Sequence, residues 1–179
     1  MLQIIVRGKE VFDEATGTFY YPNETTLNLE HSLVSISKWE SKWHKPFFSK
    51  IKHTEEETRD YIRCMTINKN VDPMVYNALN GNEINAIIDY IEDSCSAMYH
   101  DKKKNGGSRE EITSEKIYFW MFSYRIPKEC EKWHISRLLN VIELFNDANT
   151  PPKKRRPKEI AQSYASLNAQ RRKALGTRG

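Results

Sequence analysis

The hydrophobic and polar positions between residues 29 and 48 alternate with the period of an α-helix. Five apolar residues in this stretch follow one another at steps of four, three, three and four: Leu29, Leu33, Ile36, Trp39 and Trp43. Such spacing puts them on one face of a helix. Asn28 is expected to cap its start, and Pro46 disfavours helix at Lys45. Because two Trp rings one turn apart carry more apolar area than a surface helix needs, we expect the rest of the chain to pack on this face.

Before this helix, short apolar runs indicate strands. Leu2–Val6 is one run and Phe19–Tyr21 is a second, and the segment 13–17 between them is rich in turn-forming residues. The pattern predicts a β-hairpin or a small unit of two or three strands, with Thr25–Leu29 leading extended into the helix. Such a unit is not stable alone and must pack against the rest of the chain.

Further helix signals follow. Thr54 with Glu57 has the spacing of a capping box, and Asp72 before Pro73 is typical of a short helix start, which we expect to end at Gly81. The next helix face is predicted from four isoleucines: Ile84, Ile87, Ile88 and Ile91. The helix that begins at the Thr54–Glu57 capping box takes its apolar side from Tyr61, Ile62 and Met65.

Two more helices are predicted before the chain changes character. Residues 108–111 form a second capping-box pattern that opens a helix through Tyr124, and its run 117–122 is apolar on all sides, which predicts the most buried helix of the body. A last core helix is expected after Pro127, with these apolar positions: Cys130, Trp133, Leu138, Val141, Ile142 and Phe145. We expect three tryptophans to be largely buried: Trp39, Trp120 and Trp133.

Pro151 and Pro152 mark the end of this pattern. Beyond them, residues 159–174 can form a helix, but Ile160, Tyr164 and Leu167 give it only a thin apolar stripe, which is typical of a marginal helix that orders on contact with a partner. The predicted fold is therefore mainly α. A body of residues 1–149 holds five or six helices and an N-terminal β element (1–29), and residues 150–179 form a basic C-terminal arm.

Composition adds a marked division of charge. The chain has 179 residues, 39% of them hydrophobic and 11% aromatic, which is enough for one packed domain with appendages. Residues 150–179 contain nine Lys or Arg and one Glu, a net charge of +8. Since the whole chain carries +4, the remaining residues carry about −4. An acidic body therefore carries a basic arm.

Cysteine usage and the N-terminal segment indicate where such a chain works. Cys64, Cys95 and Cys130 include no CxxC pair, so neither a disulfide framework nor a zinc knuckle is expected. Arg7 interrupts the first apolar run early, and no signal peptide or membrane span is predicted. These features favour a cytoplasmic protein with free thiols and no membrane partner.

Candidate chemical sites are weak. Trp39 and Trp43 can form a binding surface, but aromatic stripes at helical spacing more often belong to a core. Cys130 and His134 are four residues apart, a spacing that can hold a metal, yet no second ligand pair accompanies them. A structural histidine is the favoured interpretation, and the same holds for these residues: His31, His44, His53 and His100.

The acidic residues do not form a catalytic pattern either. Glu55–Glu57 and Glu110–Glu111 fall in the expected first turns of helices, where the helix dipole favours negative charge. No nucleophile elbow, phosphate-binding loop or zinc-protease motif is present. We expect no catalytic activity, no cofactor and no metal.

The arm carries the strongest candidate site. Its expected partner-binding residues combine cations with the thin apolar stripe: Lys153, Lys154, Arg155, Arg156, Lys158, Ile160, Tyr164, Leu167, Arg171, Arg172 and Lys173. Clustered cations can bind nucleic-acid phosphates or act as a localisation patch, but one aromatic residue serves base stacking poorly. Docking on an acidic protein surface explains the arm equally well, and both interpretations stay open.

Several stretches resemble small proteins from the tail-morphogenesis region of phages of Gram-positive bacteria. The strings are TLNLEHSLVSISKWESKWHKPFFSK, DYIRCMT, ECEKWHISRLLNVIELFN and LNAQRRKALGTRG. The resemblance covers nearly the whole chain, is most specific over Leu27–Phe48 and Lys128–Asn146, and points to the phage tail assembly chaperones in particular.

This resemblance implies a non-catalytic role in the cytoplasm of an infected bacterium. Tail assembly chaperones coat the long tape measure protein, help to recruit tail tube protein and self-associate. Two other roles remain as alternatives: a permanent structural component of the virion, such as a connector or tail-completion protein, and a nucleic-acid-binding module that uses the basic arm.

Overall fold

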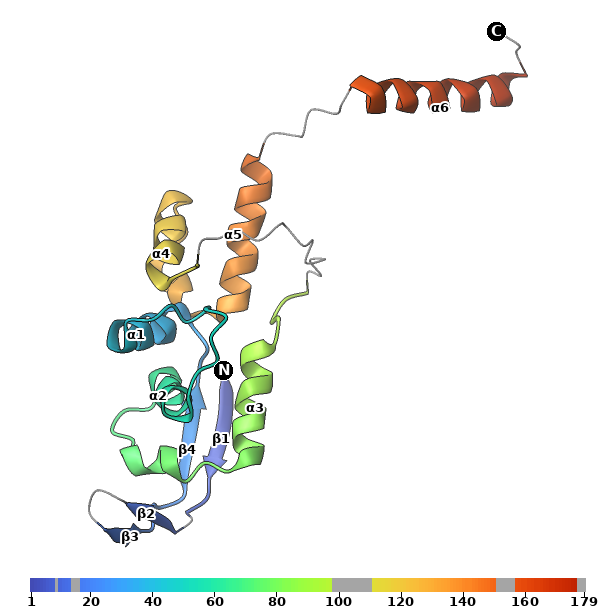
Figure 1. Cartoon of the computed structure of the whole chain (residues 1–179). Coiled ribbons are helices and arrows are strands. Elements are labelled where there is room, and N and C mark those ends of the chain that lie inside the picture. The colour runs from blue at the N-terminus through green and yellow to red at the C-terminus, as the bar shows by residue number, and fades with distance from the viewer. Residues whose placement is uncertain (9, 14–16, 98–110, 151–156, 177–179) are drawn as a thin grey trace. The chain divides into compact units, whose positions relative to one another are not determined.

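The computed structural model describes residues 1–8, 10–13, 17–97, 111–150 and 157–176 (Figure 1). Within these ranges the chain is mainly α, with a small N-terminal β element, as the pattern predicts. The elements are β1 (Leu2–Val6), β2 (Val11–Asp13), β3 (Thr18–Tyr20), β4 (Thr25–Leu29), α1 (Leu33–Trp43), α2 (Glu55–Met65), α3 (Gly81–Glu92), α4 (Ser114–Ser123), α5 (Ile135–Asn149) and α6 (Pro157–Leu175). Two short 3₁₀ helices span Pro73–Asn77 and Lys128–Lys132.

The strands pair in a nested order. β2 pairs with β3 on either side of the predicted turn, whereas β1 pairs antiparallel with β4, the extended segment that leads into α1. The prediction of a small β element is confirmed, but β1 and the aromatic run of residues 19–21 are not partners. In the β1–β4 ribbon, Ile4, Val6, Leu27 and Leu29 are buried together on one face, as the two-residue period of a strand requires.

Helix α1 starts later than predicted. Asn28 and Leu29 belong to β4, and Ser32 is the N-cap: its hydroxyl accepts the N–H of Ser35 at 3.3 Å, and Ser35 Oγ accepts the N–H of Ser32 at 2.9 Å. Leu29 is buried in β4, and it would also be buried as part of a helix, so its apolar character alone does not distinguish a strand from a helix. The C-terminal prediction is correct, because the helix ends at Trp43, before Pro46.

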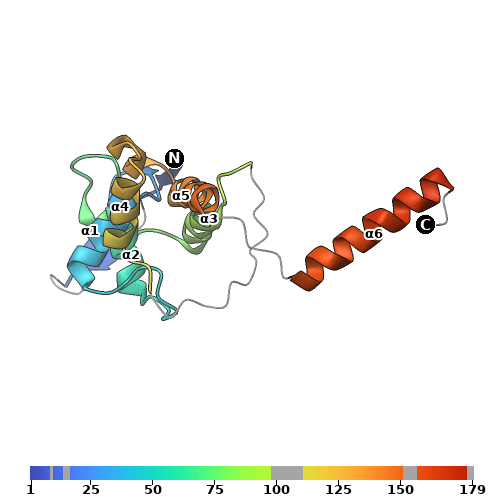
Figure 2. The ribbon, with the colours of Figure 1, turned by 90° about the horizontal axis from the view of Figure 1, so that it is seen from above.

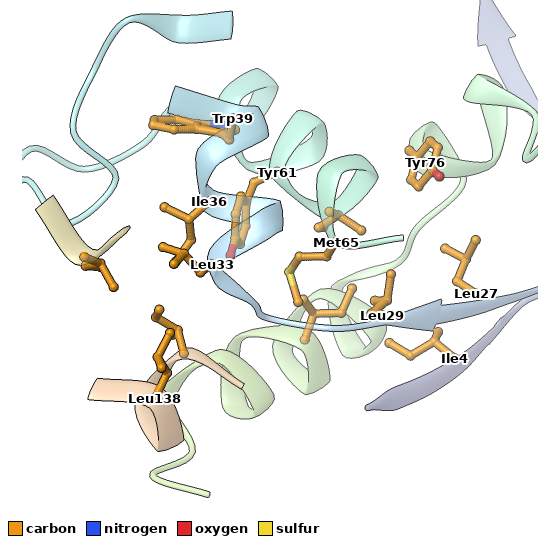
Figure 3. Close-up of a cluster of buried hydrophobic side chains, with 14 of the residues drawn as sticks. Ile4, Leu27, Leu29, Leu33, Ile36, Trp39, Tyr61, Met65, Tyr76 and Leu138 are labelled. Atoms are coloured by element: carbon orange, nitrogen blue, oxygen red, sulfur yellow. The ribbon is translucent and has the colours of Figure 1, made fainter. Parts of the chain in front are cut away.

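The core forms around the buried face of α1 (Figure 3). Leu33, Ile36 and Trp39 each have 0% exposed surface. The indole of Trp39 lies against the rings of Phe47 and His53, at centroid distances of 5.4 and 4.8 Å. Its N–H donates to the carbonyl oxygen of Glu57 at 3.0 Å. The prediction that this face organises the fold is therefore confirmed, with Trp43 only partly buried at its end.

Helix α2 begins as predicted. Glu57 N–H donates to Thr54 Oγ1 at 3.2 Å, and Thr54 N–H donates to the carboxylate of Glu57 at 2.8 Å, which completes the capping box. The predicted apolar side of α2 is buried in full: Tyr61, Ile62 and Met65. Met65 reaches the β1–β4 ribbon beside Leu29 (Figure 3).

The next helices follow their signals with one correction. Asp72 caps the 3₁₀ helix at Pro73, as expected. Gly81, however, begins α3 and does not end the preceding helix, because Asn80 accepts the first free N–H groups of α3. Of the four predicted isoleucines of α3, Ile87 is buried and Ile88 is 40% exposed, since only one side of the helix faces the body.

Helix α4 differs most from its prediction. Residues 111–113 are not helical, and residues 108–110 lie outside the described ranges, so the predicted capping box does not open this helix. The first turn is capped instead by a distant residue: Ser114 N–H donates to Glu40 of α1 at 2.8 Å. The interpretation of Glu111 as a first-turn acid is therefore wrong, whereas Glu55–Glu57 do lie in the first turn of α2.

The apolar run of α4 is only half buried. Ile117 and Met121 point into the core, but Phe119 and Phe122 are 66% and 67% exposed. An all-round apolar sequence does not specify which side is covered, and α4 lies against α1 (Figure 2). The prediction that α4 is the most buried helix is wrong.

The predicted last core helix is two elements. Cys130 is buried in the 3₁₀ helix before α5, and within α5 the buried residues include Leu138 and Ile142. Phe145 is 40% exposed. The expectation that Trp120 and Trp133 are largely buried is not met: both are only partly buried, and their outer faces are covered by Lys116 and Arg137 and not by the core.

The chain divides into two units, Met1–Phe145 and Asn146–Gly179. This division lies close to the expected end of the body at residue 149. The second unit contains the end of α5 and all of α6.

Replacing Trp39 by Ala should lower the free energy of unfolding by roughly 3–5 kcal/mol, because a fully buried indole leaves a cavity behind. Urea unfolding followed by circular dichroism measures the loss. Trp120→Ala is the matched control and should cost clearly less, since Trp120 is only partly buried. Equal losses in the two variants would contradict the central place of Trp39.

Candidate interaction surfaces

The predicted partner-binding residues of the arm lie in or before α6. Residues 153–156 are outside the described ranges, and for Lys158 and Ile160 the structure describes the helical backbone and not the side chain. Tyr164 is 64% exposed and Leu167 is 42% exposed. The helix itself covers the predicted range 159–174 and extends slightly beyond both ends.

Sequence reasoning missed one member of this apolar face. Leu175 is 75% exposed and lies eleven residues after Tyr164 and eight after Leu167. Both separations return to the same side of a helix, so the spacing contained the signal. We name Tyr164, Leu167 and Leu175 the α6 stripe. Arg171 falls within it on the same side of the helix, and Ile160 continues the spacing in the sequence.

The cations of α6 have a structural role as well as a possible binding role. Arg171, Arg172 and Lys173 are exposed, and Arg172 and Lys173 occupy the last turn of the helix. Positive charge there interacts favourably with the partial negative charge of a helix C-terminus. Their presence alone is therefore weaker evidence for nucleic-acid binding than the sequence count indicates.

A second surface, which the sequence placed in the core, is the outer side of α4. Phe119 and Phe122 project there, and the ring of Tyr118 stacks on Phe122 at a centroid distance of 6.4 Å. Tyr118 donates to Glu131 at 3.1 Å, and burial together with Glu131 raises the pKa of Tyr118 to about 12. Exposed aromatic rings of this size are typical of protein interfaces.

Two acidic side chains of α2 accept hydrogen bonds from residues at and just after the end of α1. Trp43 N–H and Lys42 both donate to Asp60, at 2.9 and 2.6 Å, and Lys45 donates to Glu57 at 2.5 Å. Burial raises the pKa of Asp60, but the hydrogen bonds from Lys42 and Trp43 outweigh this effect and lower it. The hydrogen bond from Lys45 likewise lowers the pKa of Glu57. Lys42 and Trp43 thus join α1 to α2, and Lys45 joins the loop after α1 to α2, so these acids have a structural role.

His134, the candidate metal ligand, has protein partners at both ring nitrogens. Nε2 lies 3.0 Å from the carbonyl oxygen of Tyr90, and Nδ1 accepts the N–H of Ser136 at 3.3 Å. This arrangement fixes the tautomer with the proton on Nε2. In the described part of the chain, no three His, Cys, Asp or Glu side chains gather where they could hold a metal ion.

His31 packs beside His134 in the core. Their ring centroids are 5.1 Å apart, and Nδ1 of His31 is hydrogen-bonded to the hydroxyl of Tyr61. Burial, with a smaller contribution from His134, lowers the pKa of His31 to about 3. His31 and His134 are far apart in the sequence. The backbone pairing of residues 31–32 with residues 134–135 brings their side chains together.

Two further findings concern the described helices and the similarity of the chain to known proteins. Within the described residues, no helix has both the length and the apolar content needed to cross a bilayer. Comparison of the chain with protein-family models, with curated proteins and with solved structures found no match.

Acidification should destabilise the body through His31. The folded pKa of about 3 lies below the unfolded value near 6.5, so the unfolded chain binds the proton more tightly. Stability is therefore full above pH ~6.5 and falls as the pH drops towards the folded pKa, by at most about 1.4 kcal/mol per pH unit.

Unfolding in urea at pH 7, 6 and 5 measures this slope above the range in which carboxylates titrate. His31→Asn, which keeps a hydrogen-bonding group and does not titrate, should show a flatter dependence. An unchanged slope in His31→Asn would contradict the assignment of this pH effect to His31.

Proposed function

We propose that this protein is a non-catalytic tail assembly chaperone of a long-tailed phage, and that the α6 stripe binds the tape measure protein. The observation that carries the proposal is the stripe itself: Tyr164, Leu167 and Leu175 are exposed on one side of a helix in the second unit. An amphipathic helix of this kind buries its apolar side in a groove or against the helix of a partner. The resemblance of the chain to tail assembly chaperones supplies the identity of that partner.

Charge assists this binding and does not dominate it. Arg171 lies within the stripe, with Arg172 and Lys173 beside it. These cations increase the rate of encounter with an acidic client. Burial of the apolar side chains gives the lasting affinity, which changes little with salt, in contrast to binding that depends on phosphate contacts.

The aromatic side of α4 gives the body a separate contact surface. Phe119 and Phe122 are suited to self-association or to a contact with tail tube protein, both of which the proposed role requires. A body with its own contact surface and an arm for the client can bring the two kinds of partner together.

The test is co-purification of the full chain with fragments of the tape measure protein encoded by the same phage genome, at low and high salt. Tyr164→Ser/Leu167→Ser/Leu175→Ser removes the stripe and should weaken binding at least tenfold. Gln162→Ser/Ala165→Ser/Ala169→Ser is the matched control, since it places three serines on the opposite side of α6 and should leave binding unchanged.

Three outcomes would contradict the proposal. Tight binding to duplex DNA with a steep salt dependence, together with no binding to tape measure fragments, would favour the nucleic-acid module. Detection of the chain in purified mature virions by mass spectrometry would favour a structural component, because a chaperone leaves the finished particle. Equal loss of binding in the stripe variant and its control would exclude the stripe as the binding surface.

A further inference from the structure

The strand β1 has an edge without a strand partner in the described part of the chain. The β1–β4 ribbon has two strands. The outer edge of β4 is closed by the segment after α2: Ile67 N–H donates to the carbonyl oxygen of Asn28 at 2.9 Å, and Glu30 N–H donates to that of Met65 at 3.0 Å. No equivalent segment pairs with β1 among the described residues.

The hydrogen bonds of β4 reveal which groups of β1 point outward. The N–H of Asn28 donates to the side chain of Asn68 at 2.7 Å, and its carbonyl is taken by Ile67, so both groups face away from β1. Asn28 lies opposite Gln3, which makes this a non-hydrogen-bonded pair. Gln3 must therefore direct its own N–H and C=O away from β4.

Ile5 has the same orientation. The pattern of an antiparallel ladder repeats every two residues, and the carbonyl of Thr26, opposite Ile5, accepts from Asn68 on the outer side at 3.2 Å. Gln3 and Ile5 thus present two N–H and two C=O groups at the outer edge of β1. Neither backbone has a hydrogen bond to another described residue on that side.

These groups border a groove of about 430 Å³ between β1 and the first half of α3. Gln3, Ile5 and Arg7 line one side, and Asn82, Glu83 and Ala86 line the other. β1 lies beside α3 (Figure 1). Ile5 is 54% exposed, so the groove has an apolar side chain next to the backbone groups.

We propose that this groove binds an extended segment of a partner polypeptide, which adds to β1 as a third strand. The backbone groups of Gln3 and Ile5 require a strand as their complement, and strand addition to an exposed edge is a known mode of peptide recognition. The groove has a strand edge on one side and the helix α3 on the other, which suits a single extended segment.

The charges in the groove specify the segment further. Glu83 is engaged, since its carboxylate accepts the N–H of Asn80 at 2.8 Å. Arg7 is exposed and has no ion pair among the described residues. The segment that fits therefore carries an acidic side chain opposite Arg7. This site is independent of the α6 stripe and does not rest on the proposed function.

The test uses a yeast-displayed library of random twelve-residue peptides, selected against the full chain. Enriched peptides should be rich in alternating β-branched residues with an acid at one end. Ile5→Pro removes one outward N–H without breaking the β1–β4 ladder and should lower their affinity at least tenfold. Ile5→Thr is the matched comparison, because it keeps the N–H and the strand preference while it changes the side chain, and Ile5→Pro should bind at least tenfold more weakly than Ile5→Thr.

Two further measurements locate the site. Amide hydrogen exchange by NMR should show fast exchange at Gln3 and Ile5 in the free protein and slower exchange with an enriched peptide bound. Arg7→Glu should reverse the preference from acidic to basic peptides, which keeps the proposal testable even where Ile5→Pro does not fold.

Three results would overturn the proposal. They are a selection that yields no peptide sensitive to Ile5→Pro or Arg7→Glu, unchanged exchange at Gln3 and Ile5, and loss of peptide binding in Tyr164→Ser/Leu167→Ser/Leu175→Ser. The last result would place the site on α6, whereas retention of peptide binding with loss of the tape measure fragments would separate the two surfaces.

Discussion

The body of this protein depends on the burial of one face of α1. Trp39 fills the space between α1 and α2, and its buried indole N–H is satisfied because it donates to the carbonyl oxygen of Glu57 in α2. On the same helix, the buried carboxylate of Glu40 accepts from Phe47 N–H at 2.7 Å and from Ser114 N–H at 2.8 Å. A single helix thus fixes α2, the loop after itself and the start of α4, and no change at these two residues can be purely local.

This anchoring also determines which surfaces remain available. Because Glu40 holds the first turn of α4, the helix presents Ile117 and Met121 to the core, and Phe119 and Phe122 necessarily lie on the other side. Likewise, Ile67 and Asn68 close the outer edge of β4, whereas the outer edge of β1 has no strand partner among the described residues. Neither surface results from an isolated sequence motif. Both result from elements that are packed on one side only, and packed rigid elements bind with little loss of conformational freedom.

The sequence predicted what is encoded locally. The capping box of Thr54 and Glu57, the proline start at Asp72 and the buried stripe of α1 depend on residues within a few positions of one another. What required the structure depends on distant contacts. Leu29 is buried as part of a strand although its spacing also fits a helix. The N-terminus of α4 is capped by Glu40 of α1, and His31 contacts His134 because their backbone segments pair. On the arm, the helical spacing from Tyr164 and Leu167 also reaches Leu175, which lies one residue beyond the predicted range 159–174.

The two proposed binding surfaces differ in the physical cost of using them. The edge of β1 is already held in place by β4, so an incoming strand gains hydrogen bonds without ordering the protein, and it discriminates through geometry and through Arg7. The arm is a thinly amphipathic helix, and the apolar burial that it gains with a partner must offset the cost of keeping it helical. Affinity at the arm therefore varies with the apolar area that the partner supplies, whereas affinity at the edge varies with the ability of the partner to extend. The two surfaces therefore select for different partner conformations, an extended segment at β1 and a helical one at α6.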